Sequence, residues 1–229
     1  MADIAVIVPV LNRPRNAAPL AESLADTTDR ARLLFVVSLA DTDEQFDACA
    51  ATGAAVLSVD WQPGRADYAK KIQVGYDATD EPLVLLGADD LRFRPGWLEQ
   101  VEKIAARYDC GVIGTNDGAN PAVLSGVHST HPVVRRCYID SLGGVVGQPG
   151  MVYWPGYDHQ FVDNELVATA QARGCYVHAH EARVEHLHPI FNRAVASDAT
   201  YEKGQARGLE DRRLFESRRH LWEREAVRA

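Results

Sequence analysis

The chain has 229 residues, 46% of them hydrophobic and 24% charged, which is the composition of a soluble globular protein of one large domain or two small ones. Its net charge of −8 argues against broad, nonspecific binding to nucleic acid or to an acidic membrane surface. No apolar run approaches the roughly 20 residues of a membrane span. The residues before the first apolar run lack the basic region and cleavage site of a signal peptide, so we expect none. The four scattered cysteines suit free thiols, so we expect a cytoplasmic protein without a membrane anchor.

The first half of the chain alternates short apolar runs with polar, helix-forming stretches. Helices are predicted between the strands, at residues 17–29, 44–52 and 65–77. The strands themselves are predicted at residues 4–11, 32–39, 54–59 and 83–86. Strands that alternate with helices in this way indicate βαβ units and a mostly parallel sheet. We therefore expect residues 1–116 to form the nucleotide-binding half of a Rossmann-like α/β domain.

The second half has fewer regular repeats of strand and helix. Strands are predicted at residues 112–115, 133–136, 175–180 and 182–187, and helices at 137–142, 163–173 and 209–227. Residues 151–156 are aromatic and contain a proline, which favours a loop that lines a pocket. We expect one domain at residues 1–190, with an acceptor half at 117–190, followed by a C-terminal helical extension at 191–229.

Two adjacent carboxylates, Asp89 and Asp90, directly follow the apolar run Leu83-Val84-Leu85-Leu86. Ligands bind at the carboxyl ends of strands in open α/β sheets, so a site is expected here. Neighbouring carboxylates repel each other unless a cation is present, and a hard divalent ion such as Mg2+ or Mn2+ resolves that conflict. Taken alone, the pair favours a solvated turn and helix cap.

Five short motifs follow one another along the chain. They are Pro9-Val10-Leu11-Asn12-Arg13, Ala69-Lys70-Lys71-Ile72-Gln73-Val74-Gly75, Gly87-Ala88-Asp89-Asp90, Asp163-Asn164-Glu165-Leu166 and His186-Leu187-His188-Pro189. In order and spacing they resemble the motifs of the GT-A-fold, family-2-like nucleotide-sugar glycosyltransferases. The resemblance covers roughly residues 3–190 and implies a GT-A fold with a central, mostly parallel sheet and flanking helices.

The resemblance assigns a nucleotide-sugar donor to the first two strand ends. It implies that Pro9, Asn12 and Arg13 contact the donor nucleotide, and that Asp41 reads the base from the end of the second strand. Two further cations are candidates for the donor. Arg65 follows Gly64 at a helix start, a position suited to an anionic group. Lys70 is equally a solvated helix charge.

The metal shell is implied to contain Asp89, which also contacts the donor, and Asp90. An imidazole from His186 or His188 completes it. These two histidines project to the same side of an extended strand, so the pattern does not choose between them. We favour His186 and regard His188 as equally typical of a structural histidine. The expected cofactor is Mn2+ or Mg2+.

Two departures from the family pattern concern the donor site. The usual first acid of the metal motif aligns with Gly87, which leaves the metal shell open. Asp41 stands in Ala40-Asp41-Thr42 without the usual glycine, which leaves the base specificity open.

Asp163 is the implied catalytic base, which removes the proton of the acceptor hydroxyl in inverting members of the family. Asp158 competes for this role because it lies beside the aromatic loop. In that loop, Trp154 and Tyr157 offer flat faces for an acceptor, although core packing is an equal alternative. Asp198 and Tyr201 are candidates to fold back over the site.

The sequence thus predicts a metal-dependent glycosyltransferase that moves a sugar from a nucleoside diphosphate to a hydroxyl, with inversion. A sugar-nucleotide nucleotidyltransferase is the alternative within the fold, although its usual glycine-rich loop after the first strand is absent from Leu11-Asn12-Arg13-Pro14-Arg15. A noncatalytic nucleotide-sugar-binding module is the alternative outside enzymes. The size resembles that of stand-alone glycosyltransferases, including those of bacteriophages. Possible acceptors are therefore glycans, modified DNA bases and virion proteins. If the enzyme is encoded by a phage, we expect it in the host cytoplasm.

Overall fold

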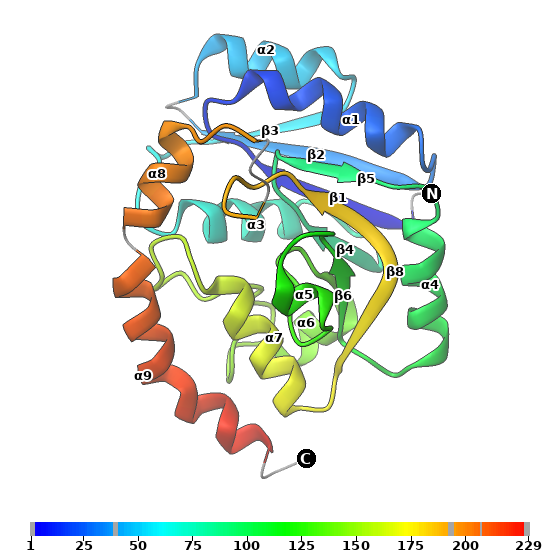
Figure 1. Cartoon of the computed structure of the whole chain (residues 1–229), viewed down its shortest axis with the longest axis vertical. Helices are drawn as coiled ribbons and strands as arrows, with labels where there is room; N and C mark the ends of the chain where they lie inside the picture. The colour runs from blue at the N-terminus through cyan, green and yellow to red at the C-terminus, as the bar shows by residue number, and fades with distance from the viewer. Residues whose placement is uncertain (1–2, 39–40, 192–194, 207, 227–229) are drawn as a thin grey trace.

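The fold is built around one mixed β-sheet. The computed structural model describes residues 3–38, 41–191, 195–206 and 208–226. Within this part of the chain, eight strands are paired in the order β3-β2-β1-β4-β7-β6-β8-β5 (Figure 1). The strands are β1 (Ile4–Pro9), β2 (Ala31–Ser38), β3 (Ala55–Val59), β4 (Leu83–Leu86), β5 (Leu91–Phe93), β6 (Val112–Asn116), β7 (Val133–Arg135) and β8 (Tyr176–His186).

The directions of the strands decide which loops meet. Strands β1 to β4 run parallel, and β6 and β8 run parallel to each other. Strand β7 is antiparallel to both of its neighbours, β4 and β6. The carboxyl ends of β4, β6 and β8 therefore lie at the same edge of the sheet as the amino end of β7. This is the edge at which ligands bind in open α/β sheets.

Helices cover both faces of the sheet, and α9 lies against α7 on the outside of the molecule (Figure 1). Helices α1 and α4 pack on one face, and α3, α6 and α7 pack on the other. Among the described residues, no helix combines the length and the apolar character that crossing a membrane requires. The helices are α1 (Ala17–Ala25), α2 (Asp43–Ala51), α3 (Asp67–Asp77), α4 (Trp97–Arg107), α5 (Pro121–Leu124), α6 (Arg136–Leu142), α7 (Val162–Ala172), α8 (Ala199–Ala206) and α9 (Gly208–Ala226), with a short 3-10 helix at Pro14–Asn16.

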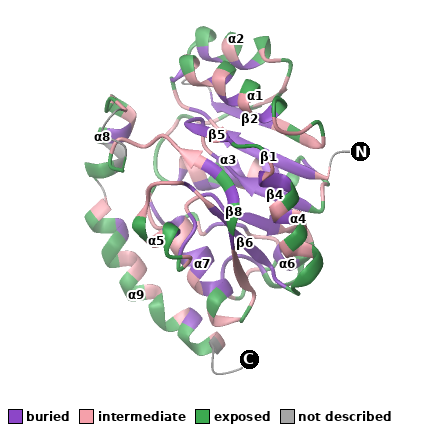
Figure 2. Ribbon diagram, turned by 45° about the vertical axis from the view of Figure 1, so that its right-hand side comes forward, coloured by how far each residue is buried: buried purple, intermediate pink, exposed green. Residues whose placement is uncertain are grey.

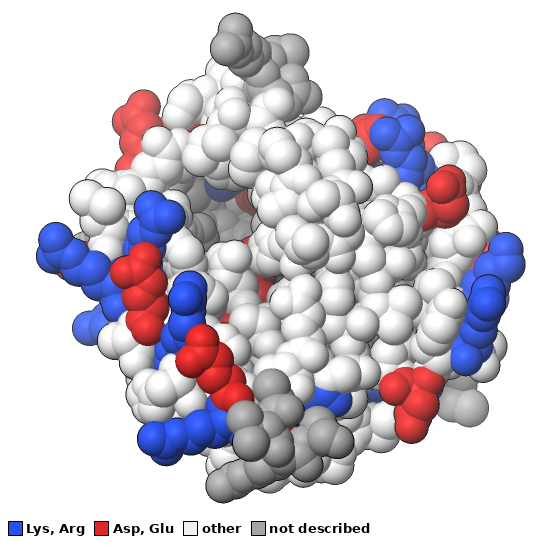
Figure 3. Space-filling model, turned by 60° about the horizontal axis from the view of Figure 1, so that its bottom comes forward, with Lys and Arg blue, Asp and Glu red and all other residues white. Residues whose placement is uncertain are grey.

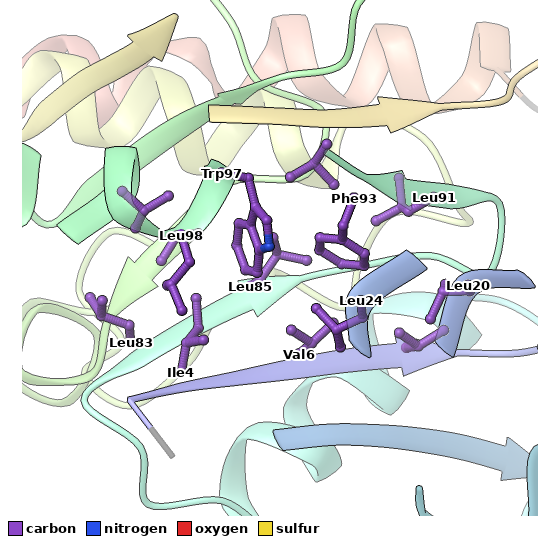
Figure 4. Close-up of a cluster of buried hydrophobic side chains, with 14 of the residues drawn as sticks. Ile4, Val6, Leu20, Leu24, Leu83, Leu85, Leu91, Phe93, Trp97 and Leu98 are labelled. Atoms are coloured by element: carbon purple, nitrogen blue, oxygen red, sulfur yellow. The ribbon is translucent and has the colours of Figure 1, made fainter. Parts of the chain in front are cut away.

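The two apolar layers begin with the alternation of side chains along β1. Ile4 and Val6 point to the face of α1 and α4, where Trp97 fills the space beside them (Figure 4). Ala5 and Ile7 point to the opposite face, toward α3. Complete burial of a large apolar side chain contributes about 1.5–3 kcal/mol, so both faces anchor this strand. Buried residues concentrate in the strands, whereas the outward faces of α2 and α9 are exposed (Figure 2).

The predicted elements of the first half are confirmed with small shifts of their ends, and the mostly parallel α/β sheet is confirmed as well. Leu39 of the predicted second strand and Val227 of the last helix lie outside the described residues. The sequence did not predict β5, α5 or α8. These elements are only three, four and eight residues long, and such short runs carry little periodic signal.

The two strands predicted at 175–180 and 182–187 form the single strand β8. Its pairing with β6 is irregular, because Gly114 pairs with His178 whereas Asn116 pairs with Arg183. The extra residues bulge out of the ladder, so two consecutive exposed residues, His180 and Glu181, interrupt the apolar alternation. The bulge made one continuous strand look like two in the sequence.

Helix α9 holds the loop that leads into α7. Both carboxylate oxygens of the buried Asp211 accept hydrogen bonds from three successive backbone N–H groups, those of residues 158, 159 and 160, at 2.8–2.9 Å. The next residue, Phe161, has a φ of +69°, a left-handed conformation that is costly for a phenylalanine. Its ring packs against Phe215 of α9. The C-terminal helix therefore stabilises the turn from which α7 starts.

We expect Asp211→Ala to destabilise the protein, because three buried N–H groups lose their common acceptor. A buried donor without a partner costs about 1–3 kcal/mol, so a clear fall in Tm and in the free energy of unfolding should follow. Urea unfolding would measure it, with Glu210→Ala at the exposed neighbouring position as the control. Equal stability of the two variants would contradict a role for Asp211 in holding this loop.

Candidate active site

The sheet edge described above gathers polar side chains from four segments. Asp89 and Asp90 follow β4, Asp117 follows β6, and His186 ends β8. His131 lies two residues before β7, on the same side because β7 runs in the opposite direction. The backbone bond from Leu86 N to Pro132 O fixes this neighbourhood.

Asp89 and Asp90 are both buried and share one positive partner. The Nη1 atom of Arg13 lies 3.1 Å from Asp89 Oδ1 and 3.4 Å from Asp90 Oδ2. Burial raises the pKa of Asp89 to about 7, against the opposing charge of Arg13. Burial alone would also raise the pKa of Asp90, but the charge of the adjacent His186 holds it well below its usual range. Asp90 is therefore the firmly ionised member of the pair.

Gly87, at the position of the missing first acid, has no room for a side chain. A Cβ atom there would lie 2.9 Å from the carbonyl oxygen of Ile7 on the neighbouring strand. The N–H of Gly87 donates to that same oxygen at 2.9 Å. The close approach of the two strands therefore requires glycine at this position.

Three buried side chains, Asp90, His131 and His186, form a group that could hold a metal ion. One potential ligand atom from each lies within 4.8 Å of the others. His188 does not belong to this group. Its ring packs edge-on against Tyr201, 4.7 Å away, and burial lowers its pKa to about 4. The sequence predicted Asp90 and His186 here but missed His131.

The segment after β8 folds back over Asp90, and it brings Asp198 and Tyr201, the two residues that the sequence offered for this role, to the site. Tyr201 Oη donates to Asp90 Oδ2 at 2.7 Å, and its ring lies 4.2 Å from the guanidinium of Arg13. Asp198 lies 3.6 Å from Arg13 and 2.7 Å from Arg15. The C-terminal extension therefore takes part in the site.

Asp163 lies in the first turn of α7 and faces His128. The distance from Asp163 Oδ2 to His128 Nε2 is 3.1 Å, and both side chains are largely buried. Burial opposes the charge of Asp163, but the hydrogen bond from His128 and the charge of His128 lower its pKa below the usual value. Asp163 is thus an ionised carboxylate within electrostatic reach of the group formed by Asp90, His131 and His186.

The predicted donor residues at the first two strand ends are brought together. Asp41 accepts from the backbone N–H of Asn12 at 2.9 Å and from that of Ser38 at 2.7 Å. Lys71 is fully buried, lies 3.6 Å from Asp41, and donates to the carbonyl of Val10 at 2.7 Å. Asp41 therefore braces the two loops in this structure, and Lys71 is a buried cation beside it that the donor assignments did not include.

The remaining donor candidates lie in different settings. Pro9 is half-buried at the last residue of β1, and Lys70 is exposed on α3. Arg65 is exposed and donates to the carbonyl of Gly156 at 3.1 Å, which joins the segment before α3 to the aromatic loop. Only Arg13, among the candidate cations at 13, 65 and 70, is in contact with the carboxylates at 89 and 90.

The aromatic loop is a packed structure. Tyr157 is fully buried, its hydroxyl donates to Glu165 at 2.7 Å, and its ring meets Trp154 edge-on. The guanidinium of Arg218 lies 3.4 Å above the Trp154 ring and pairs with Glu165 at 2.7 Å. The Tyr157 ring is enclosed and offers no face to a ligand in this structure, and Arg218 covers one face of Trp154. Glu165 serves this network rather than pairing with Asp163, as its helical spacing predicts.

The space beside Asp90 is small in this structure. A cavity of about 170 Å3 is lined by Asp90, Arg15, Arg92 and Tyr201 among others, below the roughly 300–1,000 Å3 of ordinary ligand pockets. A larger hollow of about 620 Å3 lies near Pro82, where β4 begins, away from these residues. One face of the molecule is hollowed, with acidic and basic side chains visible inside and mostly uncharged ones around part of the rim (Figure 3).

Comparison with known proteins relates this geometry to solved folds. No protein-family model and no curated protein matches the sequence. The chain is similar to the mannosyltransferase PcManGT from Pyrobaculum calidifontis, solved with GDP-Man and Mn2+, at 15% identity and a TM-score of 0.64. That match covers 99% of this chain but only 64% of the mannosyltransferase, so this chain is considerably shorter.

A second similarity is to glucosyl-3-phosphoglycerate synthase from Mycobacterium tuberculosis. In its complex with Mn2+, UDP-Glc and phosphoglyceric acid, it matches at 17% identity and a TM-score of 0.65, over 96% of this chain and 80% of that one. Its complex with Mg2+ and UDP matches at 16% identity and a TM-score of 0.59, over 89% and 74%. Matches of this extent, together with the sheet topology, show that this chain has the GT-A fold of glycosyltransferases.

Proposed function

We propose that this protein is a metal-dependent glycosyltransferase that moves a sugar from a nucleoside diphosphate to an acceptor hydroxyl, with inversion. The observation that carries the proposal is the meeting of two chemically distinct groups at one sheet edge. The Asp90 group suits a divalent cation, and the ionised Asp163 lies within its electrostatic reach. Both are set in the fold of enzymes that were solved with nucleotide sugars and Mn2+.

The chemistry of transfer requires charge stabilisation on the leaving side. A bound Mn2+ or Mg2+ would act there as a Lewis acid and stabilise the negative charge of the departing diphosphate. Asp90 would hold the cation, with His186 beside it. Arg13 lies between Asp89 and Asp90 and its guanidinium geometry matches phosphate oxygens, so we propose that it contacts the donor diphosphate.

The acceptor side requires a base. Asp163 would take the proton of the attacking hydroxyl, a role for which its lowered pKa keeps it ionised at neutral pH. His128 Nε2 faces Asp163 Oδ2, so His128 would orient the carboxylate and leave Oδ1 for the hydroxyl. Trp154 and Asp158 remain our candidates beside the acceptor; a glycan, a modified DNA base and a virion protein are the acceptor classes that we propose to test.

The direct test is a screen of nucleotide sugars by thermal shift in the presence of Mn2+. A donor that binds the native state raises Tm by mass action. The stabilising donor would then be incubated with acceptors of each class, and formation of the glycosylated product would be measured by mass spectrometry. Absence of stabilisation by every nucleotide sugar would contradict the proposal.

A noncatalytic nucleotide-sugar-binding module is the second candidate function. It is favoured by Gly87, which stands where the metal motif usually has its first acidic residue. A binding module and an enzyme differ in turnover of the bound donor. A donor that raises Tm but releases no nucleoside diphosphate over many hours, with any acceptor class, would favour the module. A sugar nucleotidyltransferase would instead release pyrophosphate from a nucleoside triphosphate.

We expect His186→Ala to raise the metal concentration for half-maximal transfer at least tenfold, because His186 Nε2 lies 3.3 Å from Asp90 Oδ1. His188→Ala should change it less than about threefold, since His188 packs on Tyr201 instead. Metal titrations of both variants at saturating donor measure the difference. A larger effect of His188→Ala than of His186→Ala would reverse the assignment.

A further inference from the structure

His131 has the arrangement of a metal ligand whose neutral tautomer is already fixed. Its Nδ1 atom lies 3.0 Å from the carbonyl oxygen of Leu86, which can only accept, so Nδ1 carries the proton. The lone pair is therefore on Nε2. That atom is buried and has no hydrogen-bond partner among the described residues, although buried polar atoms in native proteins almost always have one. A carbonyl that accepts the N–H of the other ring nitrogen, and so fixes the tautomer, is the usual companion of a metal-binding histidine.

Asp90 divides its two oxygens between different partners. Oδ2 accepts from Tyr201 at 2.7 Å and lies 3.4 Å from Arg13. Oδ1 is buried, lies 3.3 Å from His186 Nε2, and makes no hydrogen bond within the described part of the chain. Oδ1 is thus the oxygen directed at His186. Asp89 differs, since its Oδ1 lies against Arg13.

Asp90, His131 and His186 therefore offer a metal ion one carboxylate oxygen and two imidazole nitrogens. We propose that Asp90, His131 and His186 form a three-ligand centre for a nitrogen-binding transition-metal ion, of the class of Mn2+, Co2+ and Zn2+, and that this ion binds before any nucleotide. The proposal specifies the cofactor of the proposed transferase and rests on that function for its role. Its novel residue is His131, which no sequence motif indicated.

The ligand types argue for this class of ion. Imidazole suits Zn2+, Co2+ and related transition ions, whereas Mg2+ prefers oxygen ligands, keeps several waters and is held through one or two carboxylates together with substrate phosphates. A site with one carboxylate oxygen is a poor match for Mg2+. M. tuberculosis glucosyl-3-phosphoglycerate synthase, by contrast, was solved with Mg2+ as well as Mn2+.

Binding without a nucleotide follows from the number of protein ligands. All three groups are buried, belong to the sheet edge and are brought within 4.8 Å of each other in the protein alone. A cation that depends on one carboxylate needs the oxygens of the diphosphate to complete its shell. Three preorganised ligands provide affinity without them, as in metal sites that leave one position open to substrate.

The test uses the full-length protein, stripped of metal by a chelator and free of nucleotide. Isothermal titration with Mn2+, Co2+, Zn2+ and Mg2+ measures affinity, and the visible absorption of Co2+ reports nitrogen ligation directly. We expect one Mn2+, Co2+ or Zn2+ per chain and at least hundredfold weaker binding of Mg2+. His131→Ala and His131→Gln should each weaken Co2+ binding at least tenfold and change its spectrum.

His178→Ala is the matched control, because His178 is a partly buried histidine of the same sheet outside the three-ligand group. It should leave Co2+ affinity and spectrum unchanged. Thermal unfolding of the metal-free His131 variants shows that they are folded. A folded His131 variant with native Co2+ affinity, Mg2+ binding equal to that of Mn2+, or binding that requires UDP or GDP would each overturn the centre.

Failure of this centre and failure of the proposed function have different signatures. A protein that binds Co2+ through His131 but transfers no sugar from any donor retains the centre and refutes the transferase. A protein that transfers sugar with Mg2+, unaffected by His131→Gln, retains the transferase and refutes the centre. Both readouts come from the same preparations.

Discussion

Replacing Asp163 with asparagine is expected to lower the rate of sugar transfer by about 10²–10⁴-fold, the usual contribution of a positioned general base. Asparagine keeps the size of the side chain but cannot accept the proton of the acceptor hydroxyl. The carboxylate is buried, ionised and held by His128 at 3.1 Å, so its loss is not replaced by solvent. Donor affinity should stay nearly unchanged, because the proposed donor and metal groups lie on other segments.

The measurement is kcat at saturating donor, beside donor binding by titration. Asp47→Asn, on the exposed side of α2, is a carboxylate control that should keep native kcat and affinity. Asp158→Asn should be milder if Asp158 only orients the acceptor. A competent Asp163→Asn enzyme would move the base to Asp158. A retained anomeric configuration in the product, seen by NMR, would remove the inverting mechanism.

Asp90→Asn is expected to lower metal-dependent transfer by about 10³-fold or more, since a Lewis-acid metal contributes several kcal/mol to stabilising the transition state and each 1.36 kcal/mol is tenfold. The substitution removes the charge of the carboxylate whose Oδ1 lies 3.3 Å from His186. Unlike Asp163→Asn, it should also abolish binding of Mn2+ to the nucleotide-free protein. The two variants therefore separate the leaving side of the reaction from the acceptor side.

The same substitution at the neighbouring carboxylate, Asp89→Asn, tests whether the metal depends on Asp90 alone. The carboxylate of Asp89 faces Arg13, so we expect a weaker effect on Mn2+ binding and a stronger effect on donor binding. Titration of each variant with Mn2+ and then with the donor measures both quantities. If Asp89→Asn abolishes Mn2+ binding and Asp90→Asn does not, the metal is held by Asp89 and not by the group of Asp90, His131 and His186.

Local patterns in the sequence were sufficient for the first half of the fold. Apolar runs that alternate with polar helices predicted β1 to β4 and the helices between them, because burial on both faces of a parallel sheet leaves a continuous apolar signal. The same patterns placed Asp89, Asp90 and His186 at strand ends and Asp163 at a helix start. Each of these positions follows from the residue's own neighbours in the chain.

The partners of those residues were decided by tertiary structure alone. His131 precedes a strand rather than following one, and it reaches the site edge only because β7 runs antiparallel to β4. Periodicity reports which residues of a strand are buried but not the direction in which the strand pairs. His128 meets Asp163, and Asp211 holds residues 158–160, across separations of 35 and 51–53 residues. Such contacts depend on how whole elements pack, and for that reason the sequence determined the fold class and half of the site, whereas the packing supplied the other half.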